Sequence, residues 1–221
     1  MTVRIAPSVL SADFRTLGAD IAMCDAGGAD WIHIDVMDGR FVPPISYGAK
    51  VIEAARRSSS KVVDVHMMVV EPEKHFDDFV KAGADVITIH AEVAPHLDRQ
   101  LMRIKELGCK AGVALNPATP LSSIEEVVHL LDLLLIMTVN PGYGGQKFIE
   151  YSLDKIERAR FLLDQAESGA ALEVDGGISR ETIARCWSAG ADTFVAGNAI
   201  FAAADPQAEI GILRGLCVEN V

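Results

Sequence analysis

The stretch Trp31-Ile-His-Ile-Asp-Val-Met-Asp-Gly39 decides how the rest of the chain is interpreted. β-Branched residues alternate in it with His33, Asp35 and Met37, which is the twofold period of a β-strand. Side chains two positions apart lie on one face, so these three point the same way. On a solvent face they would belong to an ordinary half-exposed strand. Inside a sheet, the imidazole and the carboxylate must be paired or bind a metal ion.

Length and charge limit the kind of protein this can be. The chain has 221 residues, of which 50% are hydrophobic, and this is enough for one α/β barrel with a large core. The net charge of −11 argues against a nucleic-acid partner, whose phosphates favour a basic surface. A small phosphorylated substrate stays possible, because backbone N–H groups and helix N-termini can hold it.

Several features favour a cytoplasmic protein with no membrane partner. The N-terminal residues enter a strand pattern directly and do not have the form of a signal peptide. The longest apolar run, residues 130–139, contains Asp132 and is too short to cross a bilayer. The cysteines are widely spaced without a CxxC pair, so we expect reduced, structural thiols at Cys24, Cys109, Cys186 and Cys217.

Apolar runs alternate with segments of helical period along the whole chain. We expect strands at residues 4–10, 30–36, 62–68, 86–90, 111–115, 133–138, 172–175 and 193–196. We expect helices at residues 14–26, 48–58, 72–82, 95–107, 121–129, 148–167, 180–189 and 206–216. Repeated β-α units without a linker predict a closed (β/α)8 TIM barrel that forms a single domain over residues 1–221.

A short repeat supports this prediction. Gly28-Ala-Asp30, Gly83-Ala-Asp85 and Gly190-Ala-Asp192 each stand where a predicted helix gives way to a strand. Glycine suits the left-handed position that ends a helix, so we assign these glycines to stability and not to catalysis.

In a barrel of this kind the active site lies at the C-terminal ends of the strands. His33, Asp35, His66 and Asp175 fall at such ends and could converge. Their imidazole and carboxylate groups suit Zn²⁺, Fe²⁺, Mn²⁺ or Co²⁺ without selecting one. Each residue alone could be a hydrogen-bonded core residue, but the set would bury two negative charges without a cation. We interpret His90 as a core residue or a support for the ligands.

Two further groups of residues lie near the predicted strand ends. The glycine-rich loop 140–146 is either a tight turn or a phosphate-binding loop. Phosphate binding is favoured by the further glycine motifs at 175–178 and 196–199, because barrels commonly hold phosphate at the ends of these last two strands. Met37, Met68 and Met137 either fill the core or form an apolar wall around a reactive intermediate.

The assembled motifs closely resemble those of the ribulose-phosphate 3-epimerase family, whose members are (β/α)8 barrels. The likeness is carried by Ala6-Pro-Ser-Val-Leu-Ser-Ala-Asp13, Ile32-His-Ile-Asp-Val-Met-Asp-Gly39, Phe41-Val-Pro43, Asp64-Val-His-Met-Met68, Met137-Thr-Val-Asn-Pro-Gly-Tyr-Gly-Gly-Gln146 and Glu173-Val-Asp-Gly-Gly-Ile178. The resemblance implies a metal-dependent epimerase that interconverts D-ribulose 5-phosphate and D-xylulose 5-phosphate. It also implies a homo-oligomer.

Carried over by position, the resemblance implies one divalent metal ion on His33, Asp35, His66 and Asp175, with Asp35 and Asp175 as the catalytic pair. The implied substrate contacts are Ser8, His66, Met37, Met68, Met137, Gly142, Tyr143, Gly144, Gly145, Gly177, Gly197 and Asn198.

Three positions depart from the family pattern, namely Pro44, Ser46 and Asn198. They leave open whether a pentulose 5-phosphate or a hexulose 6-phosphate is preferred. The identity of the metal and the choice between the oxidative and the reductive pentose phosphate pathway also stay open.

Inversion at C3 next to a ketone requires a proton to leave one face and return to the other. We therefore assign Asp35 as the base and Asp175 as the acid for one direction, with the roles exchanged for the other. The hypothesis includes a cis-enediolate intermediate that the metal would stabilise through the C2 and C3 oxygens.

Four competing functions fit the sequence less well. A Schiff-base aldolase needs a lysine at the C-terminal end of a strand, but Lys61 and Lys110 precede strands and Lys147 lies in a loop. A metal-free decarboxylase needs an inward Lys/Asp alternation, which the sequence lacks. A metal hydrolase and a sugar-phosphate sensor would use the same strand-end residues. Deuterium exchange at C3 in deuterated water separates both of these from an epimerase.

Overall fold

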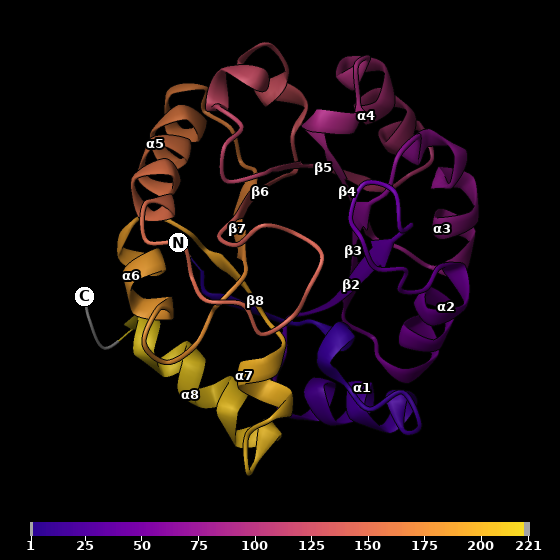
Figure 1. Ribbon diagram of the computed structural model, residues 1–221, viewed down its shortest axis with the longest axis vertical. Helices are drawn as coiled ribbons and strands as arrows, with labels where there is room; N and C mark the ends of the chain where they lie inside the picture. Colours follow the sequence, from indigo (N-terminus) through magenta and orange to yellow (C-terminus); the bar gives the residue numbers. More distant parts are fainter. Residues whose placement is uncertain (1, 219–221) are drawn as a thin grey trace.

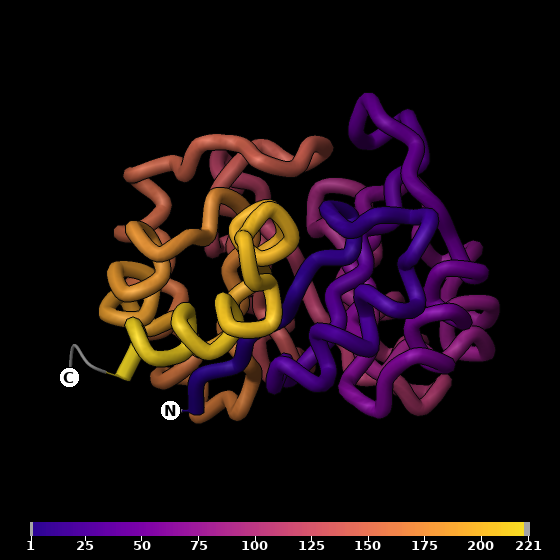
Figure 2. The backbone as a smooth tube through the Cα atoms, turned by 90° about the horizontal axis from the view of Figure 1, so that it is seen from below, coloured from indigo at the N-terminus to yellow at the C-terminus, as the bar shows by residue number. Residues whose placement is uncertain are grey.

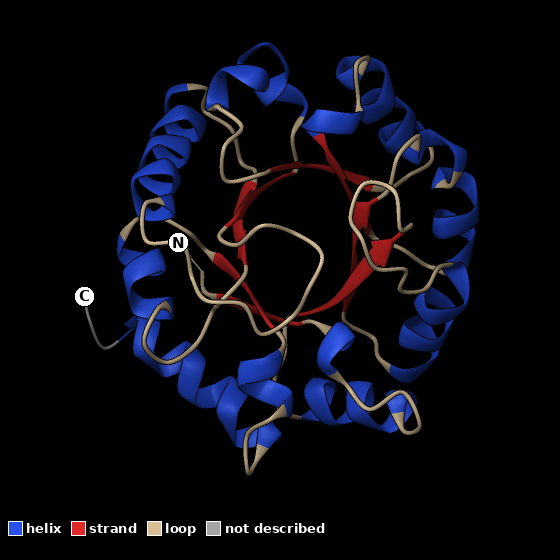
Figure 3. Cartoon of the chain, in the orientation of Figure 1, coloured by secondary structure: helices blue, strands red, loops and turns tan. Residues whose placement is uncertain are grey.

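In the computed structural model, which describes residues 2–218, a ring of parallel strands is surrounded by helices (Figures 1 and 3). The strands are β1 (Arg4–Pro7), β2 (Trp31–Met37), β3 (Val62–Met68), β4 (Val86–His90), β5 (Lys110–Leu115), β6 (Leu133–Met137), β7 (Ala171–Asp175) and β8 (Thr193–Ala196). They pair in the order β1-β8-β7-β6-β5-β4-β3-β2, and a parallel bridge between Ser8 and His33 joins the two ends. The prediction of a TIM barrel is confirmed.

The helices follow the predicted alternation. The α-helices are α1 (Leu17–Ala26), α2 (Ala49–Ser58), α3 (Phe76–Ala82), α4 (Leu97–Glu106), α5 (Ser152–Gln165), α6 (Ile183–Ser188), α7 (Asn198–Phe201) and α8 (Pro206–Val218). Short 3₁₀ turns are η1 (Val9–Ser11), η2 (Pro72–Lys74), η3 (Ala91–Val93), η4 (Leu121–Ser123) and η5 (Glu125–Leu130).

Several expected elements differ from the prediction. The helix expected at 148–167 begins at Ser152, the helix expected at 72–82 is divided into η2 and α3, and α7 was not predicted. The segment 121–129 forms the 3₁₀ turns η4 and η5 in place of an α-helix. It contains consecutive serines and β-branched residues, which are weak helix formers, in a short connection between β5 and β6. The first strand ends at Pro7 and not at Leu10, because η1 begins immediately beyond the Ser8 bridge.

The two faces of the strands bury different side chains. Ile32, Ile34 and Val36 of β2 belong to the large hydrophobic cluster that also contains residues of the helices. A smaller cluster contains Ala6 and Leu133, among other strand residues. Strand alternation thus directs the odd-numbered residues of β2 away from the helices and into the barrel. His33 and Asp35 therefore lie in the interior of a closed sheet and not on a solvent face.

The loops at one end of the barrel lie over its opening. In Figure 2 the loop that follows β6 extends along the end opposite to the N-terminus, and in Figure 1 it crosses the centre of the ring. In residues 2–218, none of the helices combines the length and the apolar character needed to cross a membrane.

All cysteines are buried with free thiols. Burial raises the pKa of Cys24 to about 12, and burial also raises that of Cys186 to about 12, so these thiols are unreactive at neutral pH.

Candidate active site

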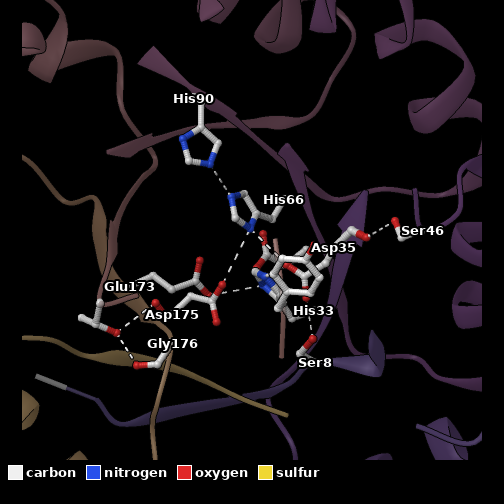
Figure 4. Close-up of polar contacts among 12 residues, drawn as sticks. Ser8, His33, Asp35, Ser46, His66, His90, Glu173, Asp175 and Gly176 are labelled. Atoms are coloured by element: carbon white, nitrogen blue, oxygen red, sulfur yellow. Dashed lines mark hydrogen bonds and ion pairs between the residues drawn. The ribbon is translucent and has the colours of Figure 1, made fainter. Parts of the chain in front are cut away.

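Four side chains from three strands converge inside the barrel, and of these only Asp175 is the last residue of its strand. His33 and Asp35 come from β2, His66 from β3 and Asp175 from β7. One ligand atom from each lies within 4.8 Å of the others (Figure 4). The register places Asp35 beside His66, whereas Asp175 arrives from across β1 and β8.

Asp35 is the centre of the contacts in this cluster. Ser8 Oγ donates a hydrogen bond of 2.5 Å to Asp35 Oδ2. Asp35 Oδ1 lies 3.1 Å from His66 Nδ1 and 3.3 Å from His33 Nε2. Asp175 Oδ2 lies 3.8 Å from His66 Nδ1. Both imidazoles therefore turn a nitrogen towards the carboxylates.

The two carboxyl groups hold protons with different strength. Burial works to raise the pKa of Asp35, but the charges and hydrogen bonds of His33 and His66 outweigh it and hold this pKa well below the usual range. Burial and then the charge of Asp35 raise the pKa of Asp175 to about 6. Asp35 is therefore ionised, and Asp175 is the carboxyl group of the pair that takes up a proton more readily.

His33 is oriented by a carboxylate behind it. Its Nδ1 lies 2.6 Å from Asp64 Oδ2, deep in the barrel. The opposite nitrogen, Nε2, is buried and makes no hydrogen bond of good geometry within the described part of the chain, with Asp35 Oδ1 3.3 Å away. An unpaired ring nitrogen beside two buried carboxylates is what a cation site requires. The residues therefore fit a divalent metal ion.

His66 is oriented through a second imidazole. Its Nε2 lies 2.8 Å from His90 Nε2, and His90 Nδ1 lies 3.1 Å from Glu92 Oε2. Burial lowers the pKa of His90 to about 4, so its ring is neutral. His90 thus lies behind a candidate ligand, as expected, and outside the group of four.

Glu173 is a buried acid that the sequence motifs did not identify as part of the site. It lies two residues before Asp175 on the inward face of β7, and its Oε1 is 3.9 Å from His33 Nδ1. Burial and then the charge of Asp64 raise the pKa of Glu173 well above its usual range. The alternation of β7 places Glu173 and Asp175 on one face, and this pattern could have identified it.

A cavity of about 410 Å³ opens beside the carboxylates. Every residue that the sequence predicts to contact substrate lines it except His66, which lies behind the wall; the lining residues are Ser8, Met37, Met68, Met137, Gly142, Tyr143, Gly144, Gly145, Gly177, Gly197 and Asn198. Asp35 and Asp175 line the same cavity. The methionines are buried, so this part of the wall is apolar.

Two glycines at the far end of the cavity pack too tightly against the protein to carry a side chain. Gly177 has a φ of +66°, and a Cβ there would lie 2.6 Å from Phe148 N. A Cβ on Gly197 would lie 2.6 Å from Ser11 Oγ. Gln146 Nε2 donates to the carbonyls of Asn140 (2.7 Å) and Tyr143 (2.9 Å), which holds the loop closed. Glycine is therefore required by packing at positions 177 and 197, where the backbone lines the cavity.

The three residues that depart from the family pattern, Pro44, Ser46 and Asn198, lie in three different surroundings. Ser46 Oγ accepts from Met37 N–H (2.9 Å) and donates to the carbonyl of Asp35 (2.7 Å), so it fixes the loop against the end of β2. Pro44 lines a neighbouring pocket with Phe14 and Tyr143. Asn198 lies at the start of α7 in the main cavity.

Comparison with known proteins gives a consistent result. The profile of the ribulose-phosphate 3 epimerase family matches residues 4–201. The chain is 49% identical over 214 residues to ribulose-phosphate 3-epimerase of Bacillus subtilis, covering 96% of this chain and 99% of that relative. It is 52% identical over 199 residues to the protein of that name from Synechocystis, covering 89% and 86%.

Among solved structures, 3-hexulose-6-phosphate synthase from Salmonella typhimurium is similar, with a TM-score of 0.70, 22% identity and coverage of 100% of both chains. At that identity the likeness concerns the fold alone.

Proposed function

The chain belongs to the ribulose-phosphate 3-epimerase family, and from this premise we propose that it interconverts D-ribulose 5-phosphate and D-xylulose 5-phosphate. The observation that carries the proposal is the convergence of Asp35 and Asp175 on one cavity from strands β2 and β7. Because β1 and β8 separate these strands in the ring, the two carboxylates approach a bound sugar from different sides.

The two aspartates divide the proton transfer. Asp35, which is ionised, removes the C3 proton from one face of the ketose, and Asp175, which takes up a proton more readily, returns a proton to the other face. The reverse reaction exchanges these roles. The hydrogen bond from Ser8 to Asp35 Oδ2 leaves Oδ1 on the side of the imidazoles and fixes the orientation of the base.

One divalent cation is part of the proposal. His33 would bind it through Nε2, His66 through Nδ1, and Asp35 and Asp175 through carboxylate oxygens. When bound, such an ion acts as a Lewis acid that stabilises the negative charge developing on substrate oxygens.

The other end of the cavity would hold the phosphate group. Backbone N–H groups of Gly142 to Gly145, Gly177 and Gly197, with the start of α7 at Asn198, are suited to an anion. Met37, Met68 and Met137 exclude water near the aspartates without supplying a proton.

The experiment follows ribulose 5-phosphate in deuterated water by NMR, with the metal content measured on the same sample. We expect xylulose 5-phosphate to form and deuterium to enter at C3. Asp35→Asn and Asp175→Asn are each expected to lower turnover by at least about 100-fold. Asp154→Asn, on the exposed face of α5, is the matched control and is expected to keep the wild-type rate.

A parallel sample with a hexulose 6-phosphate tests the choice of substrate. We expect slower exchange at C3 with the longer sugar. Absence of C3 exchange with either sugar, or a near-normal rate in either aspartate variant, would contradict the proposal.

A further inference from the structure

A line of hydrogen-bonding groups runs from the cation site to the rim of the barrel. It begins at His66 Nδ1, which faces Asp35, and passes from His66 Nε2 to His90 Nε2 over 2.8 Å. It continues from His90 Nδ1 to Glu92 Oε2 over 3.1 Å. Both imidazoles are fully buried, and Figure 4 shows their rings meeting nitrogen to nitrogen.

Glu92 is fixed at the outer end of this line. Its Oε1 accepts from the backbone N–H of Asn116 (2.8 Å) and from the hydroxyl of Thr119. The Asn116 carbonyl accepts in turn from Lys155 Nζ (2.7 Å). Burial works to raise the pKa of Glu92, but the hydrogen bonds from His90, Thr119 and Asn116 outweigh it and lower this pKa to about 2. Glu92 is therefore an acceptor at both oxygens.

Because Glu92 accepts at both oxygens, it determines where the protons lie on His90 and His66. The His90 nitrogen next to Glu92, Nδ1, must carry a hydrogen in order to donate. The 2.8 Å separation of the two Nε2 atoms leaves room for a single proton between the rings. His90 is fully buried and already gives its Nδ1–H to Glu92, so a second N–H would place a cation in the barrel wall, and we assign His90 Nε2 as the acceptor. The proton between the two rings then belongs to His66 Nε2. This holds whether or not His66 Nδ1 also carries a proton before a cation binds.

We propose that Glu92, acting through His90, is a positioning residue that fixes the His66 proton on Nε2 and thereby assigns Nδ1 to the cation. With the opposite assignment, an N–H group would point at the cation in place of a lone pair. The inference deepens the proposed function, because it concerns a ligand of the same site. Neither Glu92 nor His90 belongs to the cluster of four candidate ligands.

The other candidate imidazole ligand, His33, is also held by a carboxylate on one ring nitrogen so that the second nitrogen faces the cation site. In His33 the held nitrogen is Nδ1, whereas in His66 it is Nε2. His33 Nδ1 donates directly to Asp64 Oδ2 at 2.6 Å, which leaves Nε2 for the cation. The ring of His66 is turned the other way, so Nδ1 faces Asp35 and the cation site and Nε2 is held by His90. Each candidate imidazole ligand thus has its own carboxylate, one in direct contact and one through an intervening ring.

Glu92→Gln tests this arrangement with an isosteric side chain. The amide oxygen should stay with the Asn116 and Thr119 donors, so the amide NH₂ would face His90 Nδ1. His90 would then have to accept at Nδ1 and donate from Nε2, and His66 Nε2 would lose its proton. Glu126→Gln, on an exposed residue of η5, removes the same charge and serves as the matched control.

The readouts are long-range ¹H–¹⁵N spectra of the histidine rings and the affinity for Zn²⁺ measured by competition with a chelator. We expect wild type and the Glu126→Gln protein to carry the His66 proton on Nε2, with and without Zn²⁺. In the Glu92→Gln protein we expect this proton to be lost from Nε2 and the Zn²⁺ affinity to fall about 10- to 100-fold.

Separate measurements test the His66 tautomer and the epimerase reaction. A wild-type spectrum without a proton on His66 Nε2 overturns the inference and needs no variant. A Glu92→Gln protein with that proton retained and the affinity unchanged overturns it as well. The cation site itself is tested by the wild-type Zn²⁺ titration, and the epimerase by C3 exchange.

Discussion

At the scale of single residues, two buried carboxyl groups a few ångströms apart have pKa values shifted in opposite directions. Burial works to raise the pKa of both Asp35 and Asp175. Of the two, only Asp35 has two imidazole nitrogens and the Ser8 hydroxyl within 3.3 Å of its oxygens. These contacts lower the pKa of Asp35 by more than burial raises it. The local donors, and not the depth of burial, decide which of the two carboxyl groups stays ionised.

Lys155 gives a prediction at this scale. Burial lowers its pKa to about 8, although the charge of Glu92 opposes this. In the unfolded chain the pKa is about 10.4. Between these values the unfolded state binds more protons than the folded state, so this residue makes the free energy of unfolding rise with pH.

The measurement is urea unfolding of wild type and Lys155→Met at about pH 8 and pH 10, the two ends of that window. We expect the stability of wild type relative to the variant to increase over this interval. A difference that stays constant or shrinks would show that Lys155 titrates normally in the folded protein.

At the scale of elements, three turns that lead into strands each contain an aspartate that accepts a hydrogen bond from the backbone of the neighbouring strand. Asp30 Oδ2 accepts from the backbone N–H of Ile5 at 2.8 Å, and Asp85 Oδ2 accepts from that of Val63 at 2.7 Å. Asp132 Oδ2 accepts from Ala111 N–H at 2.9 Å. Each carboxylate therefore binds the neighbouring strand at its start, which sets the register from the end opposite to the active site.

The glycines of these turns give a prediction about stability. Gly28 and Gly83 have φ values of +84° and +108°, where an alanine is strained by about 1–2 kcal/mol. A Cβ on Gly28 would meet nothing within 4 Å, whereas one on Gly83 would lie 2.8 Å from Arg56 Cγ. We expect both alanine variants to lose stability in urea unfolding, and Gly83→Ala to lose at least as much as Gly28→Ala.

Gly215→Ala is the control for this pair. Gly215 lies within α8 with open space around it, so alanine there should stabilise the protein by about 0.5–1 kcal/mol. If Gly28→Ala and Gly215→Ala changed stability in the same direction, backbone conformation would not explain the role of Gly28.

At the scale of the whole molecule, closure of the barrel creates the site. The strands that carry Asp35 and Asp175 are separated by more than a hundred residues in sequence, and only the pairing of β1 with β8 and the bridge at Ser8 bring their ends together. The same closure gathers further acids below them, Asp64 and Glu173, in a region shielded from water. A protein that concentrates buried negative charge in this way should gain stability from a cation.

Removal of metal tests this expectation. A ligand that binds only the folded state at a hundredfold excess over its Kd adds about 2.7 kcal/mol. For a chain of this length that corresponds to a rise in Tm of about 5–10 °C. We expect chelation to lower Tm by this amount and Zn²⁺ or Mn²⁺ to restore it, measured by calorimetry. An unchanged Tm would contradict the presence of a cation in the cluster.

Much of the fold could be predicted because its signals are local. The inward position of His33 follows from strand alternation, and the ends of β3, β4 and β8 agree with the predicted ranges. The prediction of an α-helix over 121–129 was wrong, because apolar spacing does not distinguish an α-helix from successive 3₁₀ turns in a short connection.

The sequence by itself determined which residues stand at the strand ends, since a period of two assigns each strand residue to one face. It also determined the family, through motifs spread over nearly the whole chain. Only the tertiary structure decided which nitrogen of His33 and of His66 faces Asp35, and that Glu92 lies behind His90. Those facts depend on side-chain rotation and on distances between strands, and neither leaves a periodic signal in the sequence.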